Sequence, residues 1–313
     1  MIRMLVVTCI ALISVVACGG AGDSKRDTLV VFEAASLSGP MRSLLGTFAR
    51  RTGATVLEEH GASLELARRI TELHRVPDVV ALADHEVFPE LLIPSAASWY
   101  ATFARNRMVV AFTDRSRFAS EITPENWRTI LLRRDVALGR TDPVLAPAGY
   151  RALLTYDLAE SFYREPGLAK RLASQTSPGL MRGNASELAA LLSTGELDYI
   201  IEYESLALAQ HFRIVHLPPE IDLGDQGRAL EYAKAQVAVI GPRGVTRRRG
   251  APILYGISVP DRAPHADIGI RFVQFLLGAD GRAMLRAAQV DALDSAVFVG
   301  TRVPPVLTTT HVP

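Results

Sequence analysis

The 313-residue sequence has little cysteine, few aromatic residues and almost no net charge. Its two cysteines, Cys9 and Cys18, lie near the N-terminus, which excludes a disulfide, a thiolate metal site and a cysteine nucleophile from the rest of the chain. Aromatic residues make up 7% and the net charge is +1, which argues against stacking on single-stranded nucleic acid and against charge-driven nucleic-acid binding. Hydrophobic residues make up 49%, and the length is typical of two globular domains.

The sequence also lacks the short motifs that mark common catalytic sites. It contains no Gly-x-Ser-x-Gly, His-Glu-x-x-His, Walker A or Gly-x-Gly-x-x-Gly pattern. Its seven histidines never occur at i and i+4, so no helical pair of metal ligands is offered. We therefore expect a protein that is not an enzyme, carries no cofactor and has no residue that coordinates a metal directly.

Residues 1–17 have the pattern of a secretory signal. Arg3 precedes an uncharged apolar run over residues 4–17. A membrane-spanning helix needs about 20 residues, so this run is too short to be one. The run ends in Val-Val-Ala before Cys18, which resembles the signal of a bacterial lipoprotein. This predicts cleavage before Cys18, lipidation of that cysteine and a tether over residues 18–27, so that the protein lies on the extracytoplasmic face of a membrane. An unlipidated secretory signal and a buried N-terminal helix are the alternatives.

Beyond residue 27, predicted strands alternate with predicted helices. The alternation is typical of sheets covered by helices, and the length favours two α/β lobes with a cleft between them. Two late strands, at 236–240 and 253–259, flank a polar stretch that contains the run Arg247–Arg249, which predicts a hairpin with the arginines in its turn. The other predicted strands include residues 28–33, 55–59, 78–83, 108–112 and 197–203.

Four predicted helices begin after turns of small residues. These turns lie at residues 34–38, 61–63, 146–151 and 184–187. The first amides of a helix lack intrahelical acceptors and lie at the positive end of its dipole, so such ends bind anions without lysine or arginine. An ordinary helix cap explains any one of these turns, but four of them divided between two lobes predict an oxyanion cleft.

Several longer stretches resemble one family of transport proteins. They include FEAASLSGPM, ITELHRVPDVVALADHEVFPELLIP, GELDYIIEYESLA, HLPPEIDL and PILYGISVP. These are similar to the molybdate/tungstate-binding proteins of ABC importers, in the branch familiar from archaea. The resemblance implies a two-lobed periplasmic-binding-protein fold (type II), each lobe a mixed sheet flanked by helices, with the ligand in the interlobe cleft. Domain 1 would comprise residues 28–112 and 253–313, and domain 2 residues 113–252.

The same resemblance implies a set of oxyanion-binding residues in this chain. Hydroxyls of two serine turns and one tyrosine would bind the oxyanion together with backbone groups. We assign Tyr203 rather than Glu202 because only the tyrosine fits the Tyr-x-Ser pattern. Nearby Arg151 is interpreted either as an added positive charge or as a surface ion-pair partner. The implied residues are Ala35, Ser36, Ser63, Ala146, Ala148, Ala185 and Tyr203, with Ala146 the weaker candidate.

This chain departs from that family at two of those positions. The archaeal-type proteins carry Asp at the position of Ala146 and Glu at that of Ala185, where the carboxylates complete a six-coordinate metal centre. Because both are alanine here, we expect a plain tetrahedral oxyanion held by neutral donors. The sequence therefore predicts a monomeric, lipid-anchored protein that captures molybdate or tungstate and delivers it to ABC permease subunits. The alternative is another tetrahedral oxyanion, such as sulfate or phosphate.

Overall fold

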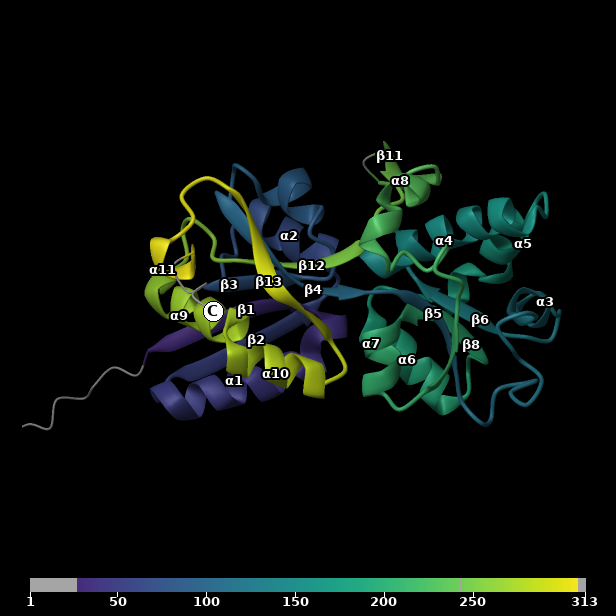
Figure 1. Cartoon of the computed structure of the whole chain (residues 1–313), viewed down its shortest axis with the longest axis horizontal. Coiled ribbons are helices and arrows are strands. Elements are labelled where there is room, and N and C mark those ends of the chain that lie inside the picture. Colours follow the sequence, from purple (N-terminus) through teal and green to yellow (C-terminus); the bar gives the residue numbers. More distant parts are fainter. Residues whose placement is uncertain (1–26, 243, 309–313) are drawn as a thin grey trace, which may run out of the picture.

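The computed structural model describes residues 27–308 except residue 243. The predicted signal over residues 1–17, Cys18 and almost all of the predicted tether lie outside the described residues. Within the described part of the chain, no helix is both long enough and apolar enough to cross a membrane. Figure 1 shows two lobes side by side along the long axis of the molecule, which confirms the expected two-lobed α/β fold.

The first lobe is built on a six-stranded mixed sheet with the order β13-β4-β12-β3-β1-β2. Strand β1 runs parallel to β2 and β3, whereas β12 is antiparallel to β3 and β4, and β13 is antiparallel to β4. The parallel part is the part predicted from alternating strands and helices. The strands are β1 (Thr28–Ala34), β2 (Thr55–Gly61), β3 (Val79–Leu82), β4 (Trp99–Asn106), β12 (Ile253–Ser258) and β13 (Asp291–Gly300).

Helices cover the faces of this sheet (Figure 1). The apolar side chains of the first long helix, including Met41, Leu44 and Phe48, are buried, and Phe48 packs edge-on against Phe272 at 5.3 Å between ring centroids. That helix ends at Gly53, whose φ of 73° is readily adopted by glycine. The helical segments of this lobe are η1 (Ala35–Leu37), α1 (Ser38–Thr52), α2 (Ser63–Thr71), η2 (Phe88–Leu92), α9 (Ala266–Leu277), α10 (Ala279–Ala287) and α11 (Pro305–Thr308).

The second lobe is built on a five-stranded mixed sheet with the order β7-β6-β8-β5-β9. Its strands are β5 (Met108–Phe112), β6 (Leu138–Thr141), β7 (Met181–Arg182), β8 (Tyr199–Tyr203) and β9 (Arg213–His216). Strand β6 is parallel to β7 and β8, and β5 is antiparallel to β8 and β9. Its helical segments are α3 (Trp127–Leu131), α4 (Pro147–Tyr163), α5 (Leu168–Gln175), η3 (Pro178–Leu180), α6 (Ala185–Thr194), α7 (Glu204–Ala209), η4 (Gln226–Arg228) and α8 (Ala229–Tyr232).

The chain crosses between the lobes twice, and the first crossing comes earlier than expected. We predicted that residues 28–112 belong to the first lobe, but β5 (Met108–Phe112) pairs with β8 and β9 of the second sheet. The first crossing therefore lies at Asn106–Arg107, between β4 and β5. The sequence does not mark this crossing, because only one residue separates β4 from β5.

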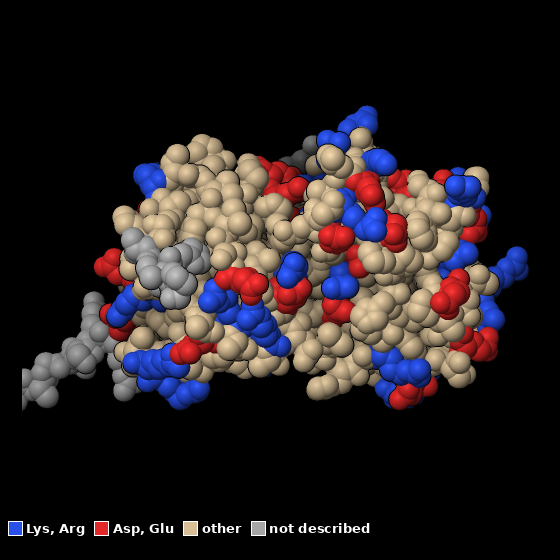
Figure 2. Space-filling view, in the orientation of Figure 1, with Lys and Arg blue, Asp and Glu red and all other residues tan. Residues whose placement is uncertain are grey.

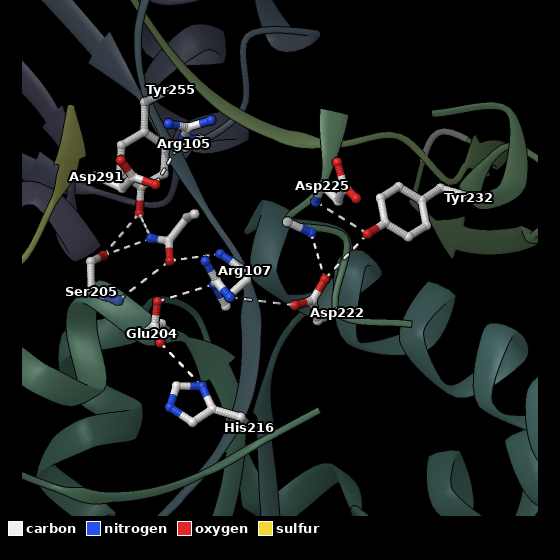
Figure 3. Close-up of polar contacts among 12 residues, drawn as sticks. Arg105, Arg107, Glu204, Ser205, His216, Asp222, Asp225, Tyr232, Tyr255 and Asp291 are labelled. Atoms are coloured by element: carbon white, nitrogen blue, oxygen red, sulfur yellow. Dashed lines mark hydrogen bonds and ion pairs between the residues drawn. The ribbon is translucent and has the colours of Figure 1, made fainter. Parts of the chain in front are cut away.

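Polar contacts hold this first crossing in place (Figure 3). The side-chain amide of Asn106 donates to Ser205 Oγ at 2.6 Å and also to the Tyr255 hydroxyl. Arg107 Nε lies 3.2 Å from Glu204 Oε2. Since Glu204 and Ser205 begin α7 and Tyr255 lies on β12, these contacts join the second lobe to the strand that follows the second crossing.

The predicted late hairpin is wrong in its partners. Strand β10 (Gln236–Gly241) pairs with β11 (Gly244–Arg249), and β12 instead enters the sheet of the first lobe. The arginines Arg247–Arg249 thus lie on a strand and not in a turn. Strand β10 was recognised because Val237 and Val239 pack towards the core, whereas β11 is almost wholly exposed and rich in arginine, so it lacks the apolar alternation by which strands are recognised.

The surface carries no single-sign field on the face that Figure 2 shows. Basic and acidic side chains are interspersed over both lobes. Many of them form exposed ion pairs, such as Arg51–Asp280 with 2.7 Å between Nη1 and Oδ2. This arrangement agrees with the near-zero net charge of the chain.

Candidate functional site

A small cavity between the lobes is lined by all seven residues predicted for the oxyanion. The space in it that is open to the centre of a water molecule is about 20 Å³, far less than the about 300–1,000 Å³ of pockets for drug-sized ligands. Glu202 is the only acidic or basic residue in the lining. The lining residues are Ala34, Ala35, Ser36, Gly61, Ala62, Ser63, Ala83, Thr141, Ala146, Pro147, Ala148, Asn184, Ala185, Glu202 and Tyr203.

The first lobe contributes the ends of three strands and the turns that follow them. Strand β1 ends at Ala34, and Ser36 lies in the short helix η1 directly after it. Strand β2 ends at Gly61, and Ser63 begins α2. The Ser63 hydroxyl accepts a hydrogen bond from the Ala83 amide at 3.1 Å, which leaves its proton available for a ligand in the cavity.

The second lobe contributes the first turns of two long helices. Asn184 caps α6, because its side-chain oxygen accepts from the Glu187 amide at 3.0 Å, as the capping-box spacing predicted. Ala185 is the first residue of that helix, and Ala148 is the second residue of α4. Amides at these positions have no intrahelical acceptor, so both are free of the helix ladder.

A glycine allows the start of α4 to lie this close to the end of β6. A Cβ atom on Gly149 would lie 2.4 Å from the Thr141 carbonyl oxygen and 2.6 Å from the Pro143 nitrogen, both of which are backbone atoms. Real Cβ atoms do not approach so closely, so the helix would have to shift. Gly149 therefore fixes the distance between the first turn of α4 and the rest of the cavity wall.

Ala146 differs from the other predicted residues in how its backbone is used. Its amide donates to the Asp142 carbonyl at 2.9 Å, within the turn that precedes α4. A backbone N–H is a single donor, so the Ala146 amide is already occupied. Ala146 lines the cavity as a small wall residue, and the amide role expected for it is disfavoured.

Tyr203 spans the cavity between the lobes. It lies at the end of β8 with 1% exposure, and its hydroxyl donates to the Ala83 carbonyl of the first lobe at 3.3 Å. That distance is long for an O–H···O bond, whose usual length is about 2.7–2.8 Å. Tyr199, on the same strand, is a core residue whose hydroxyl donates to the Arg117 carbonyl. Of the two tyrosines on β8, Tyr199 therefore lies in the core and Tyr203 in the cleft.

Two polar residues of the lining were not predicted. Thr141 and Glu202 are both fully buried, and the Thr141 hydroxyl and Glu202 Oε2 have no hydrogen-bond partner among the described residues. Thr141 ends β6 and Glu202 precedes Tyr203 on β8. The buried strand Tyr199–Tyr203 with a glutamate inside it was the available signal for Glu202, because an unpaired acid in such a strand is unusual.

The lobes also contact each other beside the cavity. Arg151 of α4 and Asp84, which follows β3, are both fully buried and pair with 2.6 Å between Nη2 and Oδ2. The Tyr150 hydroxyl donates to the same Oδ2 at 2.5 Å. Burial by itself would raise the pKa of Asp84, but Arg151 and these hydrogen bonds hold it below its ordinary value. The interpretation of Arg151 as a surface ion-pair partner is therefore wrong. Arg151 instead joins the two lobes through a buried ion pair.

Comparison with known proteins agrees with this architecture. Residues 29–288 match the family described as bacterial extracellular solute-binding proteins. The chain belongs to this family. A curated relative is the molybdate/tungstate-binding protein WtpA of Thermococcus kodakarensis, which is 32% identical over 95% of this chain and 93% of its own.

Solved structures with a similar fold have low sequence identity. The sulfate-binding protein SubI of Mycobacterium tuberculosis superposes with a TM-score of 0.62 at 14% identity, covering 91% of this chain and 90% of its own. The periplasmic molybdate-binding protein of Azotobacter vinelandii gives a TM-score of 0.59 at 18% identity, covering 84% of this chain and 98% of its own. At such identities these likenesses show the fold alone. The predicted family and fold are thus confirmed.

Proposed function

We propose that this chain is the solute-binding component of an ABC importer and captures molybdate or tungstate as a four-coordinate oxyanion. The observation that carries the proposal is the cavity itself, since residues from two serine turns, two helix N-termini and one tyrosine line one small space between the lobes. The molybdate/tungstate-binding relative at 32% identity supports this choice of ligand.

The chemistry of the lining suits a dianion. The donors that we assign are the hydroxyls of Ser36, Ser63 and Tyr203 and the amides of Ala148 and Ala185. Hydrogen bonds to charged groups contribute about 1.5–3 kcal/mol each, so five of them, less the cost of desolvation, correspond to micromolar to nanomolar affinity. No lysine or arginine lines the cavity, so binding relies on oriented neutral dipoles.

We further propose how the protein is placed and used. Lipidation of Cys18 would anchor a monomer on the extracytoplasmic face of the membrane. Opening and closing of the two lobes about the two crossings would load the oxyanion and release it to the permease subunits. Binding and delivery need no covalent step, so we assign no catalytic residue.

A second candidate ligand is sulfate. Ala146 and Ala185 stand where the resemblance implies carboxylates, so the lining offers no carboxylate at these two positions to extend coordination beyond a tetrahedron. Sulfate has the same shape and charge as molybdate, so neutral hydrogen-bond donors can bind either ion. Only the size of the closed cavity would separate the two ions.

The test is a calorimetric titration of the mature chain with tungstate, molybdate and sulfate in turn. One-to-one binding of molybdate or tungstate at submicromolar Kd, with sulfate at least about 100-fold weaker, is the expected result. Tight binding of sulfate instead would transfer the proposal to the second candidate. Absence of binding by all three ions would refute the oxyanion function.

Three variants test the site. Ser36→Ala, Ser63→Ala and Tyr203→Phe each remove one donor and should each weaken binding by about 1–3 kcal/mol, which is about 5- to 150-fold. Tyr199→Phe is the matched control, because it removes a hydroxyl from the same strand on the core side. Ser120→Ala is an exposed serine control. Unchanged affinity in all three site variants would refute the assignment of these residues.

A further inference from the structure

Glu202 is an acid buried in the wall of the cavity. It is fully buried, lines the same space as Ser36, Ser63 and Tyr203, and is the only ionisable carboxyl that does so. No arginine, lysine or histidine of the described chain forms an ion pair with it. An unpaired carboxyl in such a position would be costly as an anion, so it requires an explanation.

The two carboxyl oxygens of Glu202 have different surroundings. Oε1 accepts a hydrogen bond from the Tyr203 amide at 2.9 Å. Oε2 is buried and has no partner among the described residues. Because Oε1 is already held by the backbone, Oε2 is the atom left to interact with a ligand in the cavity.

We propose that Glu202 binds the oxyanion as a neutral carboxylic acid, with Oε2–H donating a hydrogen bond to an oxygen of the dianion. This inference rests on the proposed function and adds a sixth donor to that site. It also explains how a carboxyl remains in a cavity for a dianion, since the protonated form is a donor and only the ionised form would repel the ligand.

The surroundings of Glu202 favour the protonated form. Burial raises its pKa to about 8, while the hydrogen bond from the Tyr203 amide lowers it in part. The ionisable groups around it are Tyr203 and Tyr255, and burial raises the pKa of both phenols, that of Tyr255 to about 12. The buried ion pair Asp84–Arg151 acts on Tyr203, and the opposite charges of its two members offset each other. Glu202 is therefore the group of the lining that changes charge between pH 7 and pH 10.

Two measurable effects follow from this protonation. A bound dianion disfavours ionisation of the adjacent acid, so binding near pH 8.5 should take up protons from the solvent. Affinity should be constant near pH 7 and fall once the free protein loses the proton, with Kd about 100-fold higher at pH 10 than at pH 7. Molybdate remains a dianion over this range, so the change belongs to the protein.

The experiment is calorimetric titration of the mature chain with sodium molybdate from pH 6.5 to pH 10. At pH 8.5 the titration is repeated in buffers of different ionisation enthalpy, which gives the number of protons taken up. Glu202→Gln keeps a donor at the same place without a titrating proton, so its Kd at pH 7 should be within about threefold of the wild type and should not rise up to pH 10. Glu202→Ala removes the donor and should bind at least about tenfold more weakly at pH 7. Glu125→Gln, at an exposed site, is the control and should behave as the wild type.

The outcomes separate this inference from the proposed function. Proton uptake by the wild type that disappears in Glu202→Gln supports the inference. Molybdate binding without proton uptake, or with the same rise of Kd in the wild type and in Glu202→Gln, would overturn it and leave the oxyanion function standing. No binding by the wild type at pH 7 would refute the proposed function itself. The proton count needs only the wild-type chain, so it decides the matter even where a variant does not fold.

Discussion

Replacing Arg151 by leucine should destabilise the protein more than loss of any surface ion pair. The Asp84 Oδ2 atom accepts hydrogen bonds from Arg151 Nη2 at 2.6 Å, from Arg151 Nε at 3.2 Å and from the Tyr150 hydroxyl at 2.5 Å. Arg151 also donates to the Ala251 carbonyl at the second crossing. The leucine variant loses all of these arginine contacts and leaves a buried carboxylate without a cationic partner on Oδ2, held only by the Tyr150 hydroxyl on Oδ2 and by the Glu86 amide on Oδ1 at 3.0 Å.

The magnitude follows from full burial of both partners. Removing one member of a buried pair costs about 3–5 kcal/mol, because the remaining charge has neither water nor a partner. Two hydrogen bonds to a charged group, at about 1.5–3 kcal/mol each, give a similar figure. For Arg151→Leu we therefore expect a loss of about 3–5 kcal/mol in the free energy of unfolding. Double replacement, Asp84→Asn with Arg151→Leu, should recover part of that loss, because no buried charge remains.

The loss of stability in Arg151→Leu should also depend on pH. The folded pKa of Asp84 lies below its ordinary value of 3.8, so its stabilisation is fully present above about pH 4 and is lost as the pH falls through the folded pKa. Without Arg151, burial raises the pKa of Asp84 above its unfolded value. The difference between wild type and Arg151→Leu should therefore be smaller at pH 4 than at pH 7, and should grow over that range as the variant's Asp84 is forced to ionise.

The assay is urea unfolding followed by tryptophan fluorescence at pH 4, 5.5 and 7. Arg51→Leu is the matched control, since Arg51 and Asp280 are 54% and 61% exposed and such pairs contribute about 0–1 kcal/mol. A loss below about 1 kcal/mol for Arg151→Leu at pH 7, or a loss that does not depend on pH, would refute this reasoning.

Three further changes have predictable effects. Gly149→Ala should cost about 1–3 kcal/mol of stability and weaken molybdate binding, because the new Cβ lies 2.4 Å from the Thr141 carbonyl oxygen; thermal unfolding and titration test both. Asn184→Ala should cost about 0.5–2 kcal/mol through loss of the α6 cap, measured by urea unfolding, and normal stability would contradict the cap. Burial, with Glu58 adding to it, raises the pKa of Glu33 to about 9, so wild-type stability should fall as the pH rises from about 4.5 to 9. Glu33→Gln should reduce that fall in a pH series of melting temperatures, while the contribution of Glu202, whose pKa is also raised, remains; an unchanged slope would contradict the prediction.

The fold was predictable where strand and helix periods alternate, and was missed where they do not. The strands at 28–34 and 79–82 have short apolar runs, and those at 28–34 and 55–61 are followed by amphipathic helices. Strand β4 is buried at almost every position, so it shows no alternation, and strand β13 pairs with β4 across a shift in register. Neither has a pattern of period two by which a strand is recognised.

The site divides in a similar way. Positions such as Ser63 and Ala185 were predictable because a strand or loop followed by a helix must present its first amides and hydroxyls at that point. Thr141 and Glu202 each bury an unpaired polar atom, and this depends on the packing of both lobes. Thr141 leaves no local pattern in the sequence, whereas Glu202 is marked only by its position inside an apolar strand. The use of the Ala146 amide by Asp142 likewise depends on the conformation of the preceding turn.

The position of strand β12 determines the order in which the chain completes its lobes. This strand lies between β3 and β4, and it is made after the whole of the second lobe. The second lobe is one continuous segment between the two crossings, so it can close its core during synthesis or export. Until β12 arrives, the facing edges of β3 and β4 have no strand between them, and open edges of this kind pair readily with other chains. The half of the protein that begins the sequence is thus the last to become complete, and it is the half that a chaperone would need to cover.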